Sequence, residues 1–586
     1  MSTLSLPPTP TATISAAIGR AATIILLGLL VGFVTSVAAI SFTTAVYTLN
    51  DIMLVSEYSR FRSDTHLLAL QALSLFIPMM GGIAVAILIF RIDPRRRPSG
   101  PPDVIKAIQL QTGMPSTRSG LASTLAALIS LSIGASVGQY GPMVYLGAML
   151  GQLTARLRTS IPNITAICIS CGVAAAIAAA FNAPIAGLIF AHEVILRHYS
   201  MQTFAPVTVA ATTGYFITNV VFEKTPILVV QNSSSIPHGE EFILFAVLGL
   251  LCALVALLYM QSILFAAQKG QLFQAYPIAR GAAAGLVVGL CLLMIPEIIG
   301  LGQVTLRFST LEGAFTANEL ALFMMGKIAL TAFCLGFGFV GGVFSPALII
   351  GALFGGLFWT ILTASFGFNL SDFSIYVVCA MMAVTSPVIG APLSAILIVF
   401  ELTRSYDLAI ASMICVVFSN ALAFRVFGRS LFDRQLKNQG IDLSKGRDQA
   451  QLTALRVIDL AKADTPVFAP DDTEEVVVSA LKATGFNQGF LREPETGTFI
   501  GPVSRSDLDP KASTPVRNKI HAIDLIFDNT TNVLQAMERL ENFVGDAVPI
   551  IDPADNRLLG VVTEADIIQA YLKMVTRLRQ EENATL

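Results

Sequence analysis

The sequence predicts a polytopic α-helical membrane protein built from two related halves and followed by a soluble α/β domain. Three observations support this fold class. Of the 586 residues, 54% are hydrophobic and only 13% are charged, whereas soluble domains carry about 25% charged residues. Two sequence motifs recur in the same order within residues 21–436, and charged residues become frequent again after this segment.

The membrane part is expected to contain tilted and broken helices. A spanning helix needs roughly 20 apolar residues. Several charge-free stretches are too long for one span, too short for two, and rich in glycine and proline, which interrupt helices. The complete set of charge-free stretches is 21–50, 67–90, 119–155, 159–191, 199–222, 242–268, 281–296, 328–371, 374–400 and 408–424.

The positive charges predict how the chain is oriented. Arg91 and Arg95–Arg97 follow an apolar stretch directly, and basic loops remain on the cytoplasmic side. Residues 1–20 lack the basic start of a cleaved signal peptide, so we expect a polar cytoplasmic tail there. The C-terminal domain is expected in the cytoplasm, and the membrane is expected to be the plasma (inner) membrane.

The membrane domain contains an internal duplication. GQYGPMVYLGAMLG (138–151) aligns with GVFSPALIIGALFG (342–355), and NAPIAGLIFAHE (182–193) aligns with GAPLSAILIVFE (390–401). The offsets are 204 and 208 residues, which indicates two related halves. Broken segments at matching places in two halves point to a binding site near the middle of the membrane.

The first motif has the residue types of a helix that begins inside the membrane. Such a start has unpaired N–H groups and a partial positive charge. Glycine allows close approach to the backbone, and proline fits the first helical turn. Gly138, Gly141 and Pro142, with Gly342 and Pro346 in the second half, therefore predict an anion site made by backbone N–H groups.

Close helix packing is the alternative explanation for these glycines. We expect that role for the later glycines of each motif, which are Gly147, Gly151, Gly351 and Gly355.

On these motifs the chain resembles the CLC family of chloride channels and transporters over essentially its full length. GQYGP (138–142) is similar to the family's G-R/K-E-G-P, and GVFSP (342–346) is similar to its G-x-F-x-P. PSGPP (98–102) stands where G-S-G-I-P is usual, and FNAPIAGLIFAHEV (181–194) is close to the FNAP segment. The resemblance implies a homodimer with one pore per subunit and an inverted repeat of tilted, broken helices.

The resemblance also implies which groups contact the anion. They are the side chain of Ser99 and the backbone amides of Val343 and Phe344. In the family a tyrosine hydroxyl makes a further contact, and the matching position in GRSLFDRQL is Phe432, which has no donor.

Two departures from the family concern proton coupling. Proton-coupled members carry a glutamate gate where this chain has Tyr140, and a second glutamate where it has Val194. A phenol stays neutral near pH 7 but can donate a hydrogen bond to a passing anion. His192 is the nearby titratable side chain, although a histidine on an apolar face is more often only hydrogen-bonded. Glu193 and Glu401 occupy equivalent repeat positions, and we expect a paired structural role at a helix or dimer interface.

The C-terminal part repeats an α/β unit. A polar linker (437–451) precedes residues 452–586, in which FAPDDTEEVVVSAL (468–481) resembles FDNTTNVLQAM (527–537). The second copy resembles a CBS domain, so the region is expected to be a tandem CBS pair.

In that family the S/T-x-x-D turns lie near the ribose of bound adenine nucleotides. The matching residues are Ser504 and Asp507 in the first copy, and Thr563 and Asp566 in the second. Helix capping explains the same residue types equally well. An adenine nucleotide is therefore the one cofactor that we consider.

These observations favour a passive channel for chloride or another small anion, with Tyr140 at the gate. The alternatives are a proton-coupled chloride or fluoride antiporter with non-standard proton carriers, a transporter of another anion such as nitrate, and a nucleotide sensor with a vestigial pore. We expect no enzyme activity and no metal, because the sequence has no Ser-His-Asp set, metal cluster or phosphate loop. No feature of the sequence indicates a nucleic-acid partner.

Overall fold

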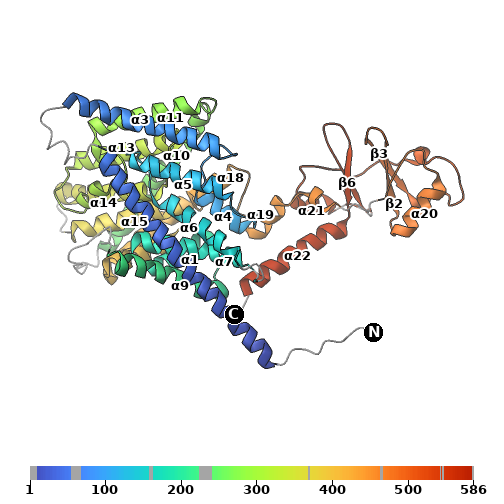
Figure 1. The fold of residues 1–586 in the computed structure, drawn as a ribbon, viewed down its shortest axis with the longest axis horizontal. Coiled ribbons are helices and arrows are strands. Elements are labelled where there is room, and N and C mark those ends of the chain that lie inside the picture. Colours follow the sequence, from blue (N-terminus) through green and yellow to red (C-terminus); the bar gives the residue numbers. More distant parts are fainter. Residues whose placement is uncertain are drawn as a thin grey trace. The chain divides into compact units, whose positions relative to one another are not determined.

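The computed structural model describes residues 10–54, 67–157, 161, 163–223, 241–366, 370–461, 466–541, 543, 545 and 547–583. Within these ranges, the side chains of 10–18, 67–71, 366 and 580–583 are not described. The chain forms two compact units, which divide between Asn438 and Gln439 (Figure 1).

The first unit is helical throughout its described residues. Its first half contains α1 (Pro10–Met53), α3 (Leu67–Ile92), α4 (Pro101–Gln109), α5 (Thr117–Ser132), α6 (Tyr140–Ala155), α7 (Ile164–Phe181), α8 (Pro184–Phe190) and α9 (Met201–Phe216). Its second half contains α10 (Glu241–Gln271), α11 (Pro277–Met294), α12 (Gln303–Phe308), α13 (Ala317–Gly336), α14 (Phe344–Phe366), α15 (Phe373–Ile389), α16 (Pro392–Thr403), α17 (Tyr406–Phe427) and α18 (Leu431–Lys437). Short π-helical turns extend α8 through Ala191–Leu196 and α9 through Ile217–Val221.

The helices of this unit confirm a multi-pass membrane protein. Among the described residues, nine helices are long and apolar enough to cross a bilayer, and shorter apolar helices such as 184–196 and 392–403 lie between them. In Figure 1, α1 (dark blue) crosses this unit, and it packs against α7 and α9. Residues 1–9 of the expected N-terminal tail lie outside the described residues, and α1 already begins at Pro10.

The expected broken helices follow the same local pattern in both halves. Asn182 caps the end of α7 and Gly390 caps the end of α15, both with a left-handed backbone conformation (φ 57° and 73°). Two residues after these caps, Pro184 and Pro392 begin the next helices. Asparagine and glycine are residues that adopt the left-handed conformation readily, and proline suits a first helical turn.

Two glutamates join the halves reciprocally. The Glu193 carboxylate accepts hydrogen bonds from the N–H groups of Leu393 and Ser394 (both 2.9 Å) and from the Ser394 hydroxyl (2.7 Å). Glu401 accepts from the N–H groups of Ile185 (2.9 Å) and Ala186 (2.8 Å). Each half thus caps the unpaired first turn of a short helix in the other half. This confirms the expected structural pairing of the two glutamates.

Glycines allow two equivalent helix pairs to approach closely. A Cβ atom on Gly151 of α6 would lie 2.1 Å from the carbonyl oxygen of Cys168 in α7. A Cβ on Gly355 of α14 would lie 2.5 Å from the carbonyl oxygen of Tyr376 in α15. Both distances are too short for any side chain, which confirms the packing role predicted for the later motif glycines.

The second unit repeats one α/β arrangement. The first copy contains β1 (Val467–Phe468), α20 (Glu474–Thr484), β2 (Gln488–Arg492) and β3 (Phe499–Ser504). The second contains β4 (Phe527–Asp528), α21 (Val533–Leu540), β5 (Val548–Ile551), β6 (Leu558–Val562) and α22 (Glu564–Asn583). In each sheet the first pair is parallel and the second antiparallel.

The structure differs from the sequence-based expectation in two places, the linker and the end of the first copy. The segment 437–451 includes the start of α19 (Arg447–Ala454). After β3 the first copy makes a single 3₁₀ turn, Arg505–Asp507, whereas the second copy continues into the long helix α22.

Candidate anion pathway

The two motif turns meet in the first unit. The amide of Gly138 donates to the carbonyl oxygen of Gly342 (2.7 Å), and the amide of Gly342 donates to the carbonyl oxygen of Gly138 (2.6 Å). A Cβ on Gly141 would lie 2.8 Å from the Cα of Gly342, so the turns could not touch with larger residues. The amide of Gly138 therefore holds the two turns together and does not point to a ligand.

The first turns of α6 and α14 start beside this contact. The amides of Val343 and Phe344 precede the first i→i−4 bond of α14, which runs from Ala347 to Val343. Pro142 has no N–H, so it leaves no unpaired donor in the first turn of α6. Amides at such starts carry the partial positive charge that attracts an anion.

Tyr140 lies in an aromatic cluster at this point. Its side chain is 3% exposed. Its ring centroid is 4.3 Å from that of Phe181 and 5.2 Å from that of Phe344, and the two phenylalanines are 5.0 Å apart. Tyr140 and Phe344, both predicted for the site, are therefore in contact. Phe181 was not assigned to the site, although its place at the end of α7, directly before the helix break, was a usable signal.

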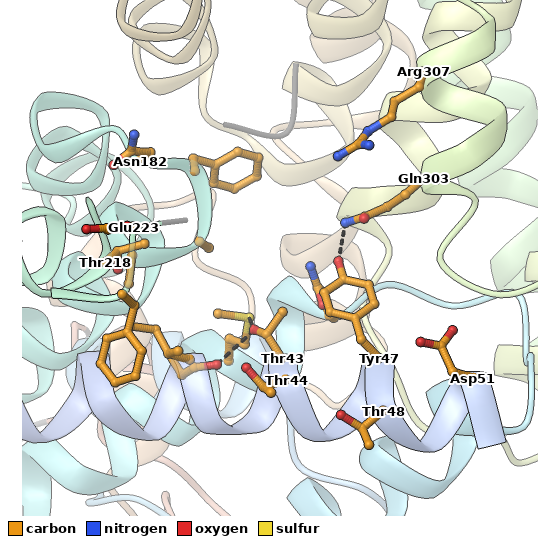
Figure 2. Close-up of a pocket in the computed structure, with 18 residues that line it drawn as sticks. Thr43, Thr44, Tyr47, Thr48, Asp51, Asn182, Thr218, Glu223, Gln303 and Arg307 are labelled. Carbon is orange, nitrogen blue, oxygen red and sulfur yellow. Dashed lines mark hydrogen bonds between the residues drawn. The ribbon is translucent and has the colours of Figure 1, made fainter. Parts of the chain in front are cut away.

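A cavity of about 430 Å³ adjoins the Tyr140 turn. Gln139 and Phe181 line it, and Figure 2 shows Arg307 and Gln303 facing Tyr47 and Asp51 of α1. The Gln303 side-chain amide donates to the Tyr47 hydroxyl. The complete lining is Ala39, Ile40, Thr43, Thr44, Tyr47, Thr48, Asp51, Gln139, Met143, Ala179, Ala180, Phe181, Asn182, Thr218, Phe222, Glu223, Gln303 and Arg307.

The charge of this cavity comes from side chains that the sequence reasoning did not select. Arg307 is exposed in it, and the acidic groups Asp51 and Glu223 also line it. Gln139 and Arg307 line the same cavity, so the basic group there comes from α12. Only the folded chain brings Arg307 to residue 139.

Ser99 precedes α4 in a charged loop. Its hydroxyl oxygen accepts a hydrogen bond from Nη2 of Arg95 (2.6 Å), and its amide donates to the Ser123 hydroxyl (2.9 Å). Arg95 also pairs with Asp93 (3.0 Å) and Asp103 (3.3 Å). Burial alone would raise the pKa of Asp93, but hydrogen bonds and the charge of Arg95 together lower it. Asp93 therefore stays ionised at neutral pH and balances the guanidinium.

Phe432 lies in the first turn of α18 and is 7% exposed. Ser430 caps this helix, with its hydroxyl 2.6 Å from Oδ2 of Asp433, and Asp433 pairs with Arg197 (2.8 Å). α18 packs against α4 and α15, so it borders the helix that Ser99 precedes. The phenyl ring can supply contact area there but no hydrogen bond.

His192 is buried in the π-helical turn after α8. Its Nδ1 lies 3.0 Å from the carbonyl oxygen of Leu188, and its Nε2 lies 3.3 Å from the hydroxyl oxygen of Thr203. The ring also stacks on Tyr199 with centroids 5.4 Å apart. Both nitrogens therefore have polar partners, as expected for a hydrogen-bonded histidine.

A buried lysine was also missed. Lys327 of α13 is fully buried, and its Nζ donates to the carbonyl oxygens of Ile298 (3.1 Å), Ile299 (3.4 Å) and Gly300 (2.9 Å). Its signal in the sequence was a single charge inside an apolar helix. The three carbonyl oxygens account for its position structurally.

The S/T-x-x-D turns of the second unit differ between the copies. In the second copy the Thr563 hydroxyl donates to the Asp566 carboxylate (2.7 Å), and the amide of Asp566 donates to the Thr563 hydroxyl (3.2 Å), which caps α22. In the first copy Asp507 lies 2.5 Å from Nε2 of His521, and the Ser504 hydroxyl is 2.8 Å from that of Ser506. Nucleotide binding at these turns stays a prediction.

Two related halves of broken apolar helices, whose glycine-rich starts meet, define a multi-pass membrane protein. Comparison with known proteins agrees with this class. The family model "Voltage gated chloride channel" matches residues 80–423, and the model "CBS domain" matches residues 522–573. The chain belongs to the voltage-gated chloride channel (CLC) family, and it carries a CBS domain pair at its C-terminal end.

Individual relatives include proteins named as channels and as exchangers. The chain is 31% identical to a "Putative chloride channel protein ClcB-like" of Ralstonia nicotianae, over 62% of this chain and 85% of the relative. It is 27% identical to an "H(+)/Cl(-) exchange transporter ClcA" of Vibrio cholerae, over 71% of this chain and 90% of the relative. The fold is similar to a crystal structure of a slow cyanobacterial Cl-/H+ antiporter, with TM-score 0.63 and 20% identity, covering 71% of this chain and 97% of that one.

Proposed function

We propose that the protein conducts chloride, or another small anion, passively between the starts of α6 and α14, with Tyr140 as an uncharged gate. The observation that supports this most is the burial of Tyr140 between Phe181 and Phe344, directly beside the two meeting turns. A neutral phenol cannot leave and re-enter the site as a charged substitute for the anion, as a carboxylate can. It can still block the path sterically and donate a hydrogen bond when its ring moves.

The anion is stabilised in this proposal by backbone dipoles. The amides of Val343 and Phe344 carry the partial charge of the α14 N-terminus. A site without a directly bound cationic side chain holds an anion weakly enough to release it quickly, which conduction requires. The side chain of Ser99 contributes the hydroxyl donor.

The absence of proton coupling follows from the positions of Tyr140 and Val194 in this proposal. Neither side chain can carry a proton near pH 7. Sealed liposomes that contain the purified protein test this directly, with chloride efflux and internal pH recorded together. We expect chloride efflux without uphill proton movement. Proton counterflow in a fixed ratio to chloride would overturn the channel proposal.

A proton-coupled antiporter is the second candidate, and one observation favours it. The hydroxyl of Thr203 donates to the carbonyl oxygen of Ser200 (2.9 Å), so both ring nitrogens of His192 face acceptors. That arrangement fits a ring that carries two protons. Under this candidate, His192→Gln should abolish proton counterflow and leave chloride binding intact, whereas a passive channel has no counterflow to lose.

We further propose that the protein is a homodimer and that its C-terminal unit is cytoplasmic.

We also propose that the CBS pair binds an adenine nucleotide at Ser504, Asp507, Thr563 and Asp566. The resemblance of these turns to those of nucleotide-binding CBS pairs supports this ligand. A nucleotide changes conduction only if it binds two arrangements of the pair unequally. Titration calorimetry of the full-length protein with ATP, ADP and AMP tests binding, and loss of heat in Asp566→Asn would support the proposed site. No heat with any millimolar nucleotide would reject it.

A further inference from the structure

The anion site has fewer hydroxyl donors than its relatives would suggest, because residue 432 is phenylalanine. Its ring is buried on α18, which packs against α4. Ser99, at the start of α4, would then be the one hydroxyl donor proposed so far for that end of the pathway. A small anion that has left its water shell needs more than one such donor to replace it.

Tyr145 carries a buried hydroxyl that makes no hydrogen bond of ordinary length and angle with the described residues. It lies on α6, five residues after Tyr140, and its side chain is 1% exposed. Its Oη atom is buried, and Ser99 is close enough to interact with it but not in the geometry of a formed hydrogen bond. A buried hydroxyl is seldom left unpaired, because desolvation without a partner is costly. An unpaired group of this kind indicates a ligand or a water that completes it.

The surroundings of Tyr145 place this hydroxyl beside Ser99. Ser99 donates its amide to Ser123 of α5, the helix whose Gly120 faces Tyr145, and it interacts with the Tyr145 hydroxyl through its side chain. The charges of Arg95, Asp93 and Asp103 also act on this hydroxyl. Gly120 of α5 makes room for the ring, since a Cβ there would lie 3.1 Å from Cε1 and 3.4 Å from Oη of Tyr145. Five residues correspond to about 7.5 Å along a helix, so Tyr145 lies roughly one and a half turns farther along α6 than Tyr140.

Arg95 prepares Ser99 to act together with this hydroxyl. Because Arg95 donates to the Ser99 oxygen (2.6 Å), the hydroxyl proton of Ser99 is left to donate elsewhere. A charge-assisted bond to the oxygen also polarises the O–H group and strengthens it as a donor. Asp93 and Asp103 balance the charge of the Arg95 guanidinium, so Arg95 does not bind the anion too tightly for release.

We propose that the hydroxyls of Tyr145 and Ser99 form a donor pair for the permeating anion and that Tyr145 replaces the hydroxyl missing at Phe432. This inference rests on the proposed anion pathway and names a further residue of that pathway. The ligand is a small monovalent anion of chloride size, because two neutral hydroxyls and a balanced guanidinium suit a single negative charge.

The test is a chloride titration of the purified full-length protein, with the heat of binding measured by calorimetry. Tyr145→Phe removes one hydroxyl and keeps the ring. We expect chloride binding to weaken about tenfold, as for loss of one hydrogen bond to a charged ligand. The double variant Tyr145→Phe/Phe432→Tyr returns a hydroxyl from the other side and should recover most of the lost affinity. Both variants should remain monodisperse on gel filtration.

Tyr376→Phe is the matched control. Tyr376 is also fully buried, but its hydroxyl donates to Glu241 (2.8 Å) and it lies on α15, away from the Ser99 loop. The Tyr376→Phe variant should bind chloride with the affinity of the unmodified protein. If Tyr145→Phe also binds chloride normally, Tyr145 has no part in the site and the inference is wrong. If the unmodified protein binds no chloride at all, the anion pathway itself is rejected, which separates the two failures.

Discussion

Tyr140 is a neutral aromatic side chain at the meeting point of two helix starts, and its neighbours explain how a phenol fits there. Phe181 and Phe344 enclose it on two sides, so the ring is held by apolar contacts. A charged side chain in that position would lose its hydration without a cationic partner. The aromatic cluster therefore favours a gate that works by the volume of the ring.

Replacing Tyr140 tests this interpretation. Tyr140→Ala should open the path and raise chloride flux by roughly 5- to 30-fold, equivalent to lowering the barrier by about 1–2 kcal/mol. Tyr140→Phe keeps the volume and should change flux much less. Liposome efflux at equal protein density compares the variants. Equal flux in all three proteins would mean that Tyr140 faces away from the pathway.

Arg307 is the second residue for which the structure makes a specific prediction. A positive charge in a cavity raises the local concentration of anions, and salt screens this effect. Arg307→Gln should therefore lower chloride flux by about twofold at low ionic strength and have little effect at high salt. Arg404→Gln changes an exposed arginine outside the cavity and serves as the control. A salt-independent loss of flux would argue for a structural role of Arg307 instead.

At the level of helices, the reciprocal caps of Glu193 and Glu401 determine how the two halves join. Each carboxylate satisfies the first N–H groups of a helix that belongs to the other half. Water cannot replace these partners easily within an apolar unit, so the caps matter more than similar caps on a soluble surface. The short helices α8 and α16 depend on them for their orientation.

Glu193→Gln and Glu401→Gln should each destabilise the membrane unit by about 1–2 kcal/mol, because the amide keeps one acceptor but loses the charge at the helix start. Thermal unfolding in detergent should show a lower midpoint for both. Glu312→Gln, an exposed loop change, is the control. Unchanged midpoints together with lost flux would instead place these glutamates in permeation.

At the level of the whole molecule, the second unit should respond to acid through one carboxyl in each copy. Hydrogen bonds from the Thr514 hydroxyl and from the amide of Asp509 lower the pKa of Glu474. Hydrogen bonds from Thr530 and Thr531 lower the pKa of Asp528, although burial opposes them. A carboxyl whose pKa is lowered by folding stabilises the fold above its ordinary pKa, and this contribution is lost as the pH falls.

We therefore expect the unfolding transition of this unit to move to lower temperature as the pH drops from about 5 to 3, a range that begins just above the ordinary pKa values of these groups and extends toward their lowered values. Asp528→Asn should make the unfolding midpoint less dependent on pH. It should also lower the midpoint at pH 7, because the stabilising carboxylate is gone. Scanning calorimetry of the full-length protein follows the transition. A midpoint that is equally sensitive to acid in the variant would show that other groups dominate.

The sequence alone determined the local features of this protein. Charge-free stretches, the two aligned motifs and the glycine–proline turns predicted a duplicated membrane domain of broken helices, and the similarity of 468–481 to 527–537 predicted a repeated α/β unit. The packing glycines were predicted in this way, whereas Tyr140 and Phe344 were assigned to the site from the family resemblance. These features can be read in sequence because hydropathy, helix starts and helix breaks depend on residues that are close together along the chain.

Only the tertiary structure decided which distant groups meet. The mutual hydrogen bonds of Gly138 and Gly342 took one predicted donor out of the site, and the crossed caps of Glu193 and Glu401 joined the halves. Arg307 reached the cavity beside Gln139, and Tyr145 came to lie beside Ser99. Such contacts join residues separated by dozens to hundreds of positions, and they arise from how whole helices pack, which no local pattern in one sequence specifies.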